Sequence, residues 1–283
     1  MLTKAQEAYI LDRAYVPEHC ICLLTHVSGG EPYLIDDFFM CRKENWLILI
    51  GYPLADNFTD NALKAVLTKI KKTFHPEMVS LVAPALPSSL ATTCHESQSD
   101  AYFTLETQSP TIRSPVKRNL RKARQNLHVE LCSVMHESHR ELMDEIVART
   151  PLSERVQRLL FKMPEFVAAA DNAFVLNAWD KENRLSAFYV VDFEAQEFSN
   201  YIIGGHSKKN YVVGASDLLL LELIELSLEY QKPYIHLGLG VNAGIRRFKE
   251  KWGAKPTRRY ELCELSLKKP SILKSILSWR QFS

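Results

Sequence analysis

The segment between residues 174 and 237 constrains the fold of this chain most strongly. Three apolar runs separated by short polar turns predict an antiparallel meander of strands over 174–179, 185–193 and 197–205. A glycine-containing loop over 204–214 then leads into a long apolar helix, expected over 216–230, and a short buried strand, expected over 234–237. This order of elements predicts an α+β fold with mixed, mostly antiparallel sheets.

The first hundred residues also alternate between strands and helices. Thr3 and Gln6 have the spacing of a capping box, so a helix is expected to begin the chain. The next expected elements are a hairpin over 32–40 and 46–52, a helix capped by Thr59 and running to about 74, and a buried strand over 79–83. Residues 84–100 are rich in Pro, Ser and Thr, which predicts a connection, followed by a strand over 101–105.

Helices predominate on either side of the meander. Ser114 and Pro115 form a strong helix start, because serine caps and proline fits the first helical position, and this helix is expected to run to about 126. The other expected elements are a strand over 129–134, helical structure over 137–170 with interruptions at Pro151 and Pro164, a helix over 243–252, a strand over 259–267 and a short helix over 270–281.

Basic residues are concentrated in two segments. The whole chain has a net charge of only +2, but residues 113–124 hold six basic and no acidic residues, and residues 246–259 hold seven basic residues and one acidic residue. The rest of the chain is therefore acidic. If the two basic segments converge in space, they form a site for a phosphate-rich ligand.

The six cysteines do not form a metal-binding pattern. They are scattered, and the one close pair, Cys20 and Cys22, lacks a second pair at the spacing of a zinc site. A spacing of two puts both thiols on one face of an expected strand, which favours ordinary packing over metal binding. His136 and His139 have no evident third ligand. We therefore expect reduced cysteines and no metal site.

Neither a secretion signal nor a membrane span is expected. The longest apolar runs are far shorter than the roughly 20 residues that cross a bilayer. The beginning of the chain carries Glu7 and Asp12 within its apolar pattern, unlike a secretion signal. These features predict a cytoplasmic protein.

Three short motifs in the second part of the chain point to a family. They are the basic run Lys117–Arg124, the pair Gly214–Leu219 and Tyr234–Gly238, and the run Arg-Phe-Lys-Glu-Lys-Trp-Gly over 247–253. With the order of elements from about 115 to 265, they resemble the GNAT superfamily of N-acyltransferases, and more narrowly its FemAB-type and phosphatidylglycerol-lysyltransferase-type branches. The first 110 residues resemble a degenerate copy of the same fold more loosely.

The resemblance implies two GNAT-like halves in tandem, a degenerate domain over 1–108 and an acyltransferase domain over 109–283. It implies transfer of an acyl or aminoacyl group to an amine from acyl-CoA or from aminoacyl-tRNA, with tRNA as a possible partner and no permanently bound cofactor. The site residues that it suggests are Lys249 near the transferred group with Arg247 and Phe248 beside it, Gly214, Ala215 and Ser216 at the donor, and a basic groove of Lys117, Arg118, Arg121 and Lys122.

Amine attack on a thioester or ester needs a held donor, a polarised carbonyl and an acceptor for the amine proton. Backbone N–H groups near 214–216 or 238–240 and the Lys249 cation are candidates to polarise the carbonyl. The candidate bases are His236 and His206, and the candidate acids for the leaving group are Tyr211 and Tyr201. The loop departs from the usual GNAT pyrophosphate loop, because it carries Tyr211 at the first position and Ser216 at the last.

Structural roles account for the same residues. His236 fits a hydrogen-bonded core histidine as well as a base, Gly214 fits an ordinary turn, and Lys249 and Arg247 fit a solvated helix face. Two other functions therefore stay open beside the transferase. One is a non-catalytic RNA-binding protein, which the basic segments suggest. The other is a partner-binding protein on a GNAT-like scaffold, which the imperfect glycine loop suggests.

Overall fold

The computed structural model describes residues 1–55, 57–108 and 114–267, whose strands form one eleven-stranded sheet in the order β1-β2-β3-β4-β11-β5-β10-β9-β8-β7-β6. The strands are β1 (Glu31–Ile35), β2 (Phe38–Lys43), β3 (Trp46–Ile50), β4 (Met78–Ala83), β5 (Glu96–Glu106), β6 (Leu127–Cys132), β7 (Ala173–Asp180), β8 (Leu185–Asp192), β9 (Phe198–His206), β10 (Tyr234–Leu239) and β11 (Lys255–Ser266). Neighbours are antiparallel except β3–β4 and β9–β10, which confirms the predicted mixed, mostly antiparallel α+β fold.

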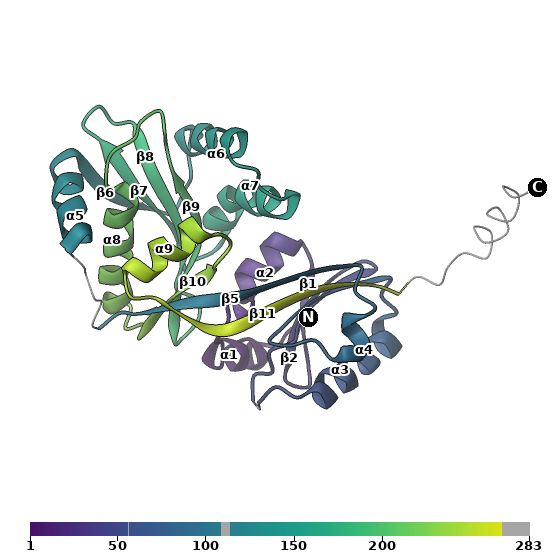
Figure 1. Cartoon of the computed structure of the whole chain (residues 1–283). Coiled ribbons are helices and arrows are strands. Elements are labelled where there is room, and N and C mark those ends of the chain that lie inside the picture. Colours follow the sequence, from purple (N-terminus) through teal and green to yellow (C-terminus); the bar gives the residue numbers. More distant parts are fainter. Residues whose placement is uncertain (56, 109–113, 268–283) are drawn as a thin grey trace, which may run out of the picture.

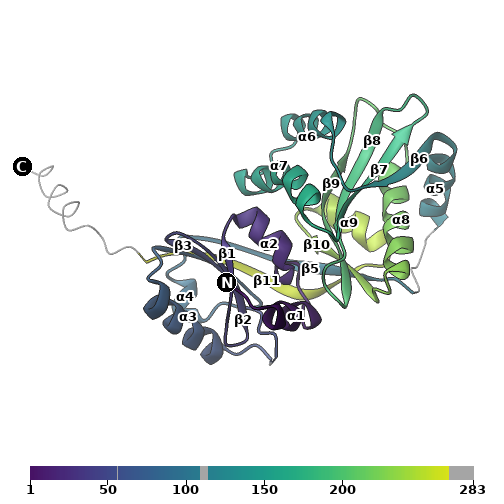
Figure 2. The same cartoon turned by 180° about the vertical axis from the view of Figure 1, so that it is seen from behind.

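Helices cover both faces of this sheet. They are α1 (Lys4–Asp12), the 3-10 helix η1 (Pro17–His19), α2 (Ile21–Ser28), α3 (Asp60–Phe74), α4 (Ser88–Ala91), α5 (Ser114–Asn126), α6 (Glu137–Arg149), α7 (Glu154–Ala169), α8 (Ala215–Glu229) and α9 (Ala243–Lys251). In the part drawn in teal and green, α5 and α8 pack on one face and α6 and α7 on the other (Figure 1). From behind, α2 lies between the two parts of the molecule, beside α7 (Figure 2).

The topology repeats within the chain. In the first half, the meander β1–β3 leads through α3 into β4, which runs parallel to β3. In the second half, the meander β6–β9 leads through α8 into β10, which runs parallel to β9. Each half then exchanges its last strand with the other, because β5 pairs with β10 and β11 pairs with β4. The exchanged strands also pair with each other along most of their length.

Several predicted elements are confirmed with their physical causes. Thr3 and Gln6 form the reciprocal capping box of α1, and the Thr59 side chain accepts from the Ala62 N–H at the start of α3. The meander, α8 and β10 also lie where the apolar pattern predicted them. The apolar side chains of α5 and α8 pack with those of β10, which gives the second half one of its two cores.

Three local predictions are wrong. The expected strand over 32–40 is two strands, because Asp36 adopts a left-handed turn conformation with φ of 52°. The expected strand at Cys20 and Cys22 is the start of α2, with Cys20 at the N-cap. The interruption at Pro164 does not occur, because α7 continues through it while Met163 and Phe166 are buried in the core.

The connection expected over 84–100 is shorter than predicted, because β5 begins at Glu96 and pairs there with Glu264 of β11. The prediction that all six cysteines are reduced is also wrong, since Cys94 and Cys263 form a disulfide. Their thiols meet because the end of this connection runs back along β11, where the backbone N–H of His95 donates to the carbonyl of Glu264.

The helix expected over 270–281 lies outside the described residues. Within the ranges that the structure describes, no helix has both the length and the apolar character that a membrane crossing requires.

Candidate functional site

The parallel strands β9 and β10 part from each other near the middle of the sheet. They pair only between Phe198–Asn200 and Tyr234–His236. Beyond His236 the register of β10 shifts, helped by the left-handed Gly238 with φ of 70°, and Leu239 pairs with Tyr102 of β5. On its edge toward β10, β9 pairs with no described strand over 201–206, although its other edge stays paired with β8. Apart from the His206 carbonyl, which accepts from the Arg149 guanidinium, the backbone groups of β9 on the side of β10 can therefore meet a ligand.

His236 lies beside this parting on the sheet face that α1 and α2 cover. Its ring is completely buried, lies 4.9 Å from the Tyr102 ring, and its Nε2 has no hydrogen-bond partner among the described residues. The Tyr102 hydroxyl donates to Glu18 Oε2 at 2.6 Å. Burial, with smaller contributions from Lys249 and Arg258, lowers the pKa of His236 to about 3. The imidazole is therefore neutral at pH 7 and resists protonation. Its Nδ1 accepts from the Gly238 N–H at 3.3 Å, so Nε2 carries the ring hydrogen.

Lys249 approaches the same region from the opposite sheet face. It is 4 % exposed, its Nζ donates to the Leu239 carbonyl at 2.5 Å, and it lies 5.5 Å from the centre of the Phe103 ring. Burial lowers its pKa to about 7, and the nearby Asp100 carboxylate opposes this shift. Lys249 is thus not part of a solvated helix face, and near neutral pH it exists in both protonation states.

The two basic helices, α5 and α9, converge at the start of α8. The buried Asp217 carboxylate accepts from Lys251 Nζ at 2.6 Å and from the Trp252 indole at 2.9 Å, and its other oxygen lies 3.3 Å from the Asn119 amide. Gly214 is required beside it, because a Cβ there would lie 2.6 Å from the Asn119 carbonyl oxygen and φ is 86°. The negative charge of Asp217 is therefore compensated by Lys251, Trp252 and Asn119 of the same chain.

Replacing Asp217 with asparagine is expected to lower the free energy of unfolding by about 2 kcal/mol, because Lys251 loses its ion pair and a polar contact of α5 or α9 is left unsatisfied. Urea denaturation of the whole chain measures this change. Glu225→Gln on the same helix is the control, since Glu225 is exposed and 3.9 Å from Arg124, and its effect should stay below about 0.5 kcal/mol. Equal effects of the two substitutions would contradict this role of Asp217.

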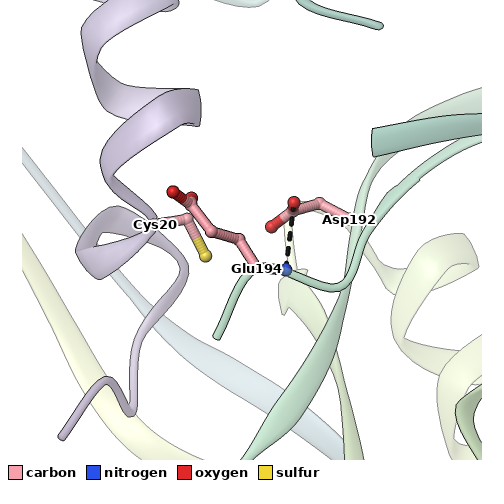
Figure 3. Close-up of side chains that lie close together, drawn as sticks. All are labelled: Cys20, Asp192 and Glu194. Atoms are coloured by element: carbon pink, nitrogen blue, oxygen red, sulfur yellow. Dashed lines mark hydrogen bonds between the residues drawn. The ribbon is translucent and has the colours of Figure 1, made fainter. Parts of the chain in front are cut away.

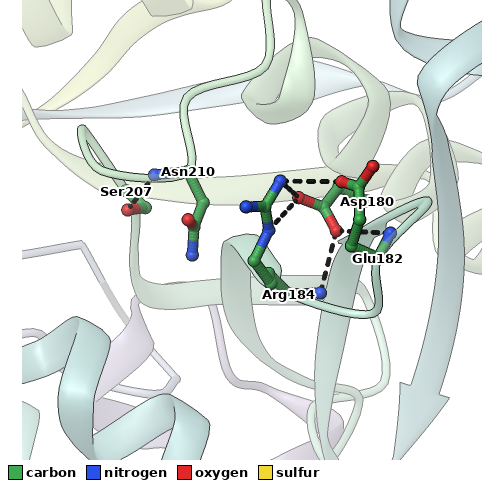
Figure 4. A network of polar contacts seen from close by, with 5 residues as sticks. All are labelled: Asp180, Glu182, Arg184, Ser207 and Asn210. Atoms are coloured by element: carbon green, nitrogen blue, oxygen red, sulfur yellow. Dashed lines mark hydrogen bonds and ion pairs between the residues drawn. The ribbon is translucent and has the colours of Figure 1, made fainter.

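A cavity of about 400 Å³ opens beside the loop that precedes α8. Its lining includes Lys122 and Asn126 of α5, the turn from Asp180 to Arg184, and Tyr211 to Val213. Arg184 holds that turn through Asp180 and Glu182, opposite the loop of Ser207 and Asn210 (Figure 4). The cavity thus combines an exposed aromatic ring with three cationic side chains and with two carboxylates, both of which pair with Arg184.

The other predicted site residues lie near this cavity or are exposed to solvent. Tyr211 is 59 % exposed, and its ring lies 5.9 Å from the ring of His206 at the end of β9. The Ala215 N–H donates to Val212, and the Ser216 carbonyl accepts from Tyr189. Phe248 is half-buried. The predicted donor and groove residues that are exposed are Arg247, Lys117, Arg118, Arg121 and Lys122. Of these, Lys122 lines the cavity.

Sequence reasoning missed three residues near the parting. Glu18 and Tyr102 lie far apart in the sequence and meet only in the fold. Asp100 accepts from the Val241 N–H at 2.8 Å and lies 3.5 Å from Arg246, so it holds the start of α9. No local spacing in the sequence predicts these contacts, because each joins residues that lie far apart along the chain.

No model of a known protein family matches the sequence, and no curated protein matches it. Solved structures are similar to the whole chain. FemX is 10% identical with a TM-score of 0.62, covering 92% of this chain and 96% of that one. The C-terminal DUF2156 domain of a putative lysylphosphatidylglycerol synthetase from Agrobacterium fabrum is 12% identical with a TM-score of 0.60, covering 98% and 95%. A tandem GNAT protein from the clavulanic acid biosynthesis pathway is 10% identical with a TM-score of 0.52, covering 94% and 95%.

These similarities extend over nearly the full length of both chains in each pair. Because the sequence identity is only 10–12%, these similarities establish the fold alone. The chain has a tandem GNAT fold, as the resemblance of its motifs implied.

Proposed function

We propose that this chain is an N-acyltransferase that moves an acyl or aminoacyl group from an activated donor to an amine at the parting of β9 and β10. The observation that carries the proposal is that His236 and Lys249 reach this parting from opposite faces of the sheet. A donor can therefore approach the parting from one face of the sheet and an acceptor from the other face, so that their reacting atoms come together between the two strands. The tandem GNAT fold and the names of FemX and the putative lysylphosphatidylglycerol synthetase support the same reaction class.

In the proposed reaction, the acceptor nitrogen attacks the donor carbonyl and the new C–N bond forms as the C–S or C–O bond to the carrier breaks. The proton of the amine passes to water or to a second acceptor amine. His236 Nδ1 accepts from the Gly238 N–H, so its Nε2, the atom without a partner, carries a hydrogen that it can donate to the substrate carbonyl oxygen. The Lys249 cation and free N–H groups of β9 stabilise the charge on the carbonyl oxygen. Tyr201, which lies on β9 at the parting, is better placed than Tyr211 to protonate the leaving group.

The donor is proposed to lie on the face of α5, α8 and α9. The cavity beside Lys122 and Tyr211 then holds its nucleotide or phosphate groups, and the exposed cations of α5 extend this surface. On α9, Phe248 packs against the core that α5 and α8 share, and Arg247 is exposed beside it. On the other face, Glu18 and Tyr102 of the first half flank the acceptor. Residues 109–283 would thus supply the transfer site, and residues 1–108 part of the acceptor side.

Ligand binding to the intact chain tests the donor class. We expect the melting temperature to rise with acetyl-CoA or a longer acyl-CoA, or with aminoacylated tRNA, because a ligand that binds only the folded state stabilises it by about 2.7 kcal/mol at 100 times its Kd. The stabilising donor, mixed with amine acceptors, should yield an acceptor heavier by one acyl group in mass spectrometry. Lys122→Glu should weaken the shift, whereas Lys72→Glu, on the exposed end of α3, should not.

Two results would overturn the proposal. If tRNA binds with steep salt dependence but no donor is ever consumed, the chain is an RNA-binding protein. If neither donor class changes the melting temperature and no product forms, the scaffold has another role, such as binding a partner protein.

A further inference from the structure

We propose that Cys20, Asp192 and Glu194 form a Zn²⁺ site that joins the two halves of the molecule. Cys20 precedes α2 in the first half, whereas Asp192 ends β8 and Glu194 follows it in the second half. One ligand atom from each side chain lies within 4.8 Å of the others. Figure 3 shows the three side chains converging between the end of β8 and the start of α2.

The burial of these groups is unusual for side chains that ionise. Cys20 is completely buried and Asp192 is 1 % exposed. The Asp192 carboxylate accepts from the Glu194 N–H, and the Phe193 N–H and the Cys20 thiol also lie close enough to favour its charged form. Its Oδ2 has no donor at good hydrogen-bond geometry among the described residues. In Figure 3 the carboxylate oxygen without a dashed line is the one nearer Glu194 and Cys20. A buried carboxylate oxygen without a donor is costly unless a proton or a cation meets it.

The ligand types suit zinc. One thiolate with two carboxylates is a mixed sulfur and oxygen set, which a borderline-soft ion accepts and Mg²⁺ or Ca²⁺ does not favour. At the usual zinc bond lengths, tetrahedral ligand atoms lie about 3.6 Å apart, so the side chains need to close by only about 1 Å. Glu194 is only half-buried, which leaves a route for the ion and room for water as a fourth ligand.

The charges also balance. Three ionised ligands carry three negative charges, and Zn²⁺ supplies two positive ones. The third comes from the buried Lys232, whose Nζ donates to the carbonyl of Ala195, the residue after Glu194, at 2.7 Å. The loaded cluster would therefore be neutral in its buried setting, as buried charged groups require.

Protons offer a competing account. Burial raises the pKa of Asp192 to about 6 and that of Glu194 to about 8, so the cluster can hold protons in place of a metal. Glu194 also caps α2, because both its oxygens lie 3.2 Å from the Cys22 N–H. Measurement of metal binding separates these two states without any activity assay.

The test uses the full chain, dialysed against a chelator and then titrated with Zn²⁺ in competition with a metal indicator. We expect one Zn²⁺ per chain and a higher melting temperature on loading. Cys20→Ser and Asp192→Asn should each weaken binding by about 100-fold or more. Cys41→Ala is the matched control, because Cys41 is a buried free cysteine on β2. The affinity of this variant for Zn²⁺ should equal that of the wild type.

If Cys20→Ser and Asp192→Asn prevent folding, Glu194→Gln is the alternative variant, because the Glu194 side chain is partly exposed and its replacement should leave the fold intact. Substituting Co²⁺ gives a second readout, since a thiolate ligand adds a charge-transfer absorption that Cys20→Ser removes. Absence of stoichiometric binding by the wild type would overturn the proposal. Binding that survives all three ligand substitutions would overturn it as well, because the ion would then occupy surface histidines.

Discussion

Replacing Lys249 with methionine is expected to lower kcat/KM for acyl transfer by about 10³-fold while the protein stays folded. Methionine retains the apolar stem over Phe103 but removes the cation that lies next to the Leu239 carbonyl. Activity with the donor identified by thermal shift measures the loss, and circular dichroism verifies the fold. Glu250→Ala on the exposed side of the same helix should change kcat/KM by less than about twofold. Unchanged turnover of Lys249→Met would remove Lys249 from the mechanism.

The pH profile shows which form of Lys249 acts. Because burial lowers its pKa to about 7, the cation is lost as pH rises through 7. The ratio of wild-type kcat/KM to that of Lys249→Arg should therefore fall above pH 7, since arginine stays charged. Taking this ratio cancels the deprotonation of the acceptor amine, which raises both rates. A ratio that rises above pH 7 would instead identify neutral Lys249 as the base.

Removing the disulfide between Cys94 and Cys263 is expected to lower the free energy of unfolding by about 5 kcal/mol, a loss comparable to the whole stability of many domains. The bond closes a loop between cysteines 169 residues apart, so it strongly restricts the unfolded chain. It also fixes the connection after α4 against β11. Urea denaturation of the oxidised protein, the reduced protein and Cys94→Ser measures the effect.

The control for this prediction lies in the same titration. A reducing agent should destabilise the wild type and leave Cys94→Ser unchanged, because the other four cysteines are free. Equal stability of the oxidised and reduced wild type would show that the bond makes no net contribution.

Local patterns predicted the parts of the fold that local contacts form. The meander, α8 and the capped helices follow from periodicity and capping residues that lie within a few positions of each other. The start of α2 was misread because Cys20 and Cys22 suggest a period of two, whereas Glu194 from the second half caps this helix. Neither that contact nor the Cys94–Cys263 bond has a signature near either residue.

The candidate site shows the same division. The run at 247–253 drew attention to Lys249, but its position on a helix otherwise rich in exposed charge gave no sign that it is buried. Its burial depends on Phe103 and the end of β10, which belong to other parts of the chain. Likewise, the basic groove rested on the charge of the run Lys117–Arg124 and on its family resemblance, and of its four α5 residues Lys122 lines the cavity. Composition identifies such side chains, while topology decides which of them meet.

The reciprocal placement of β5 and β11 bears on how the protein is made. During synthesis β4 and β5 emerge before the strand that fills the space between them, because β11 follows β10 and α9 in the sequence. Until then β4 and β5 each lack a neighbour, and their exposed edges invite pairing with other chains. Folding of this sheet is therefore expected to wait until β11 has been synthesised, instead of proceeding half by half, and to depend on protection of the nascent chain.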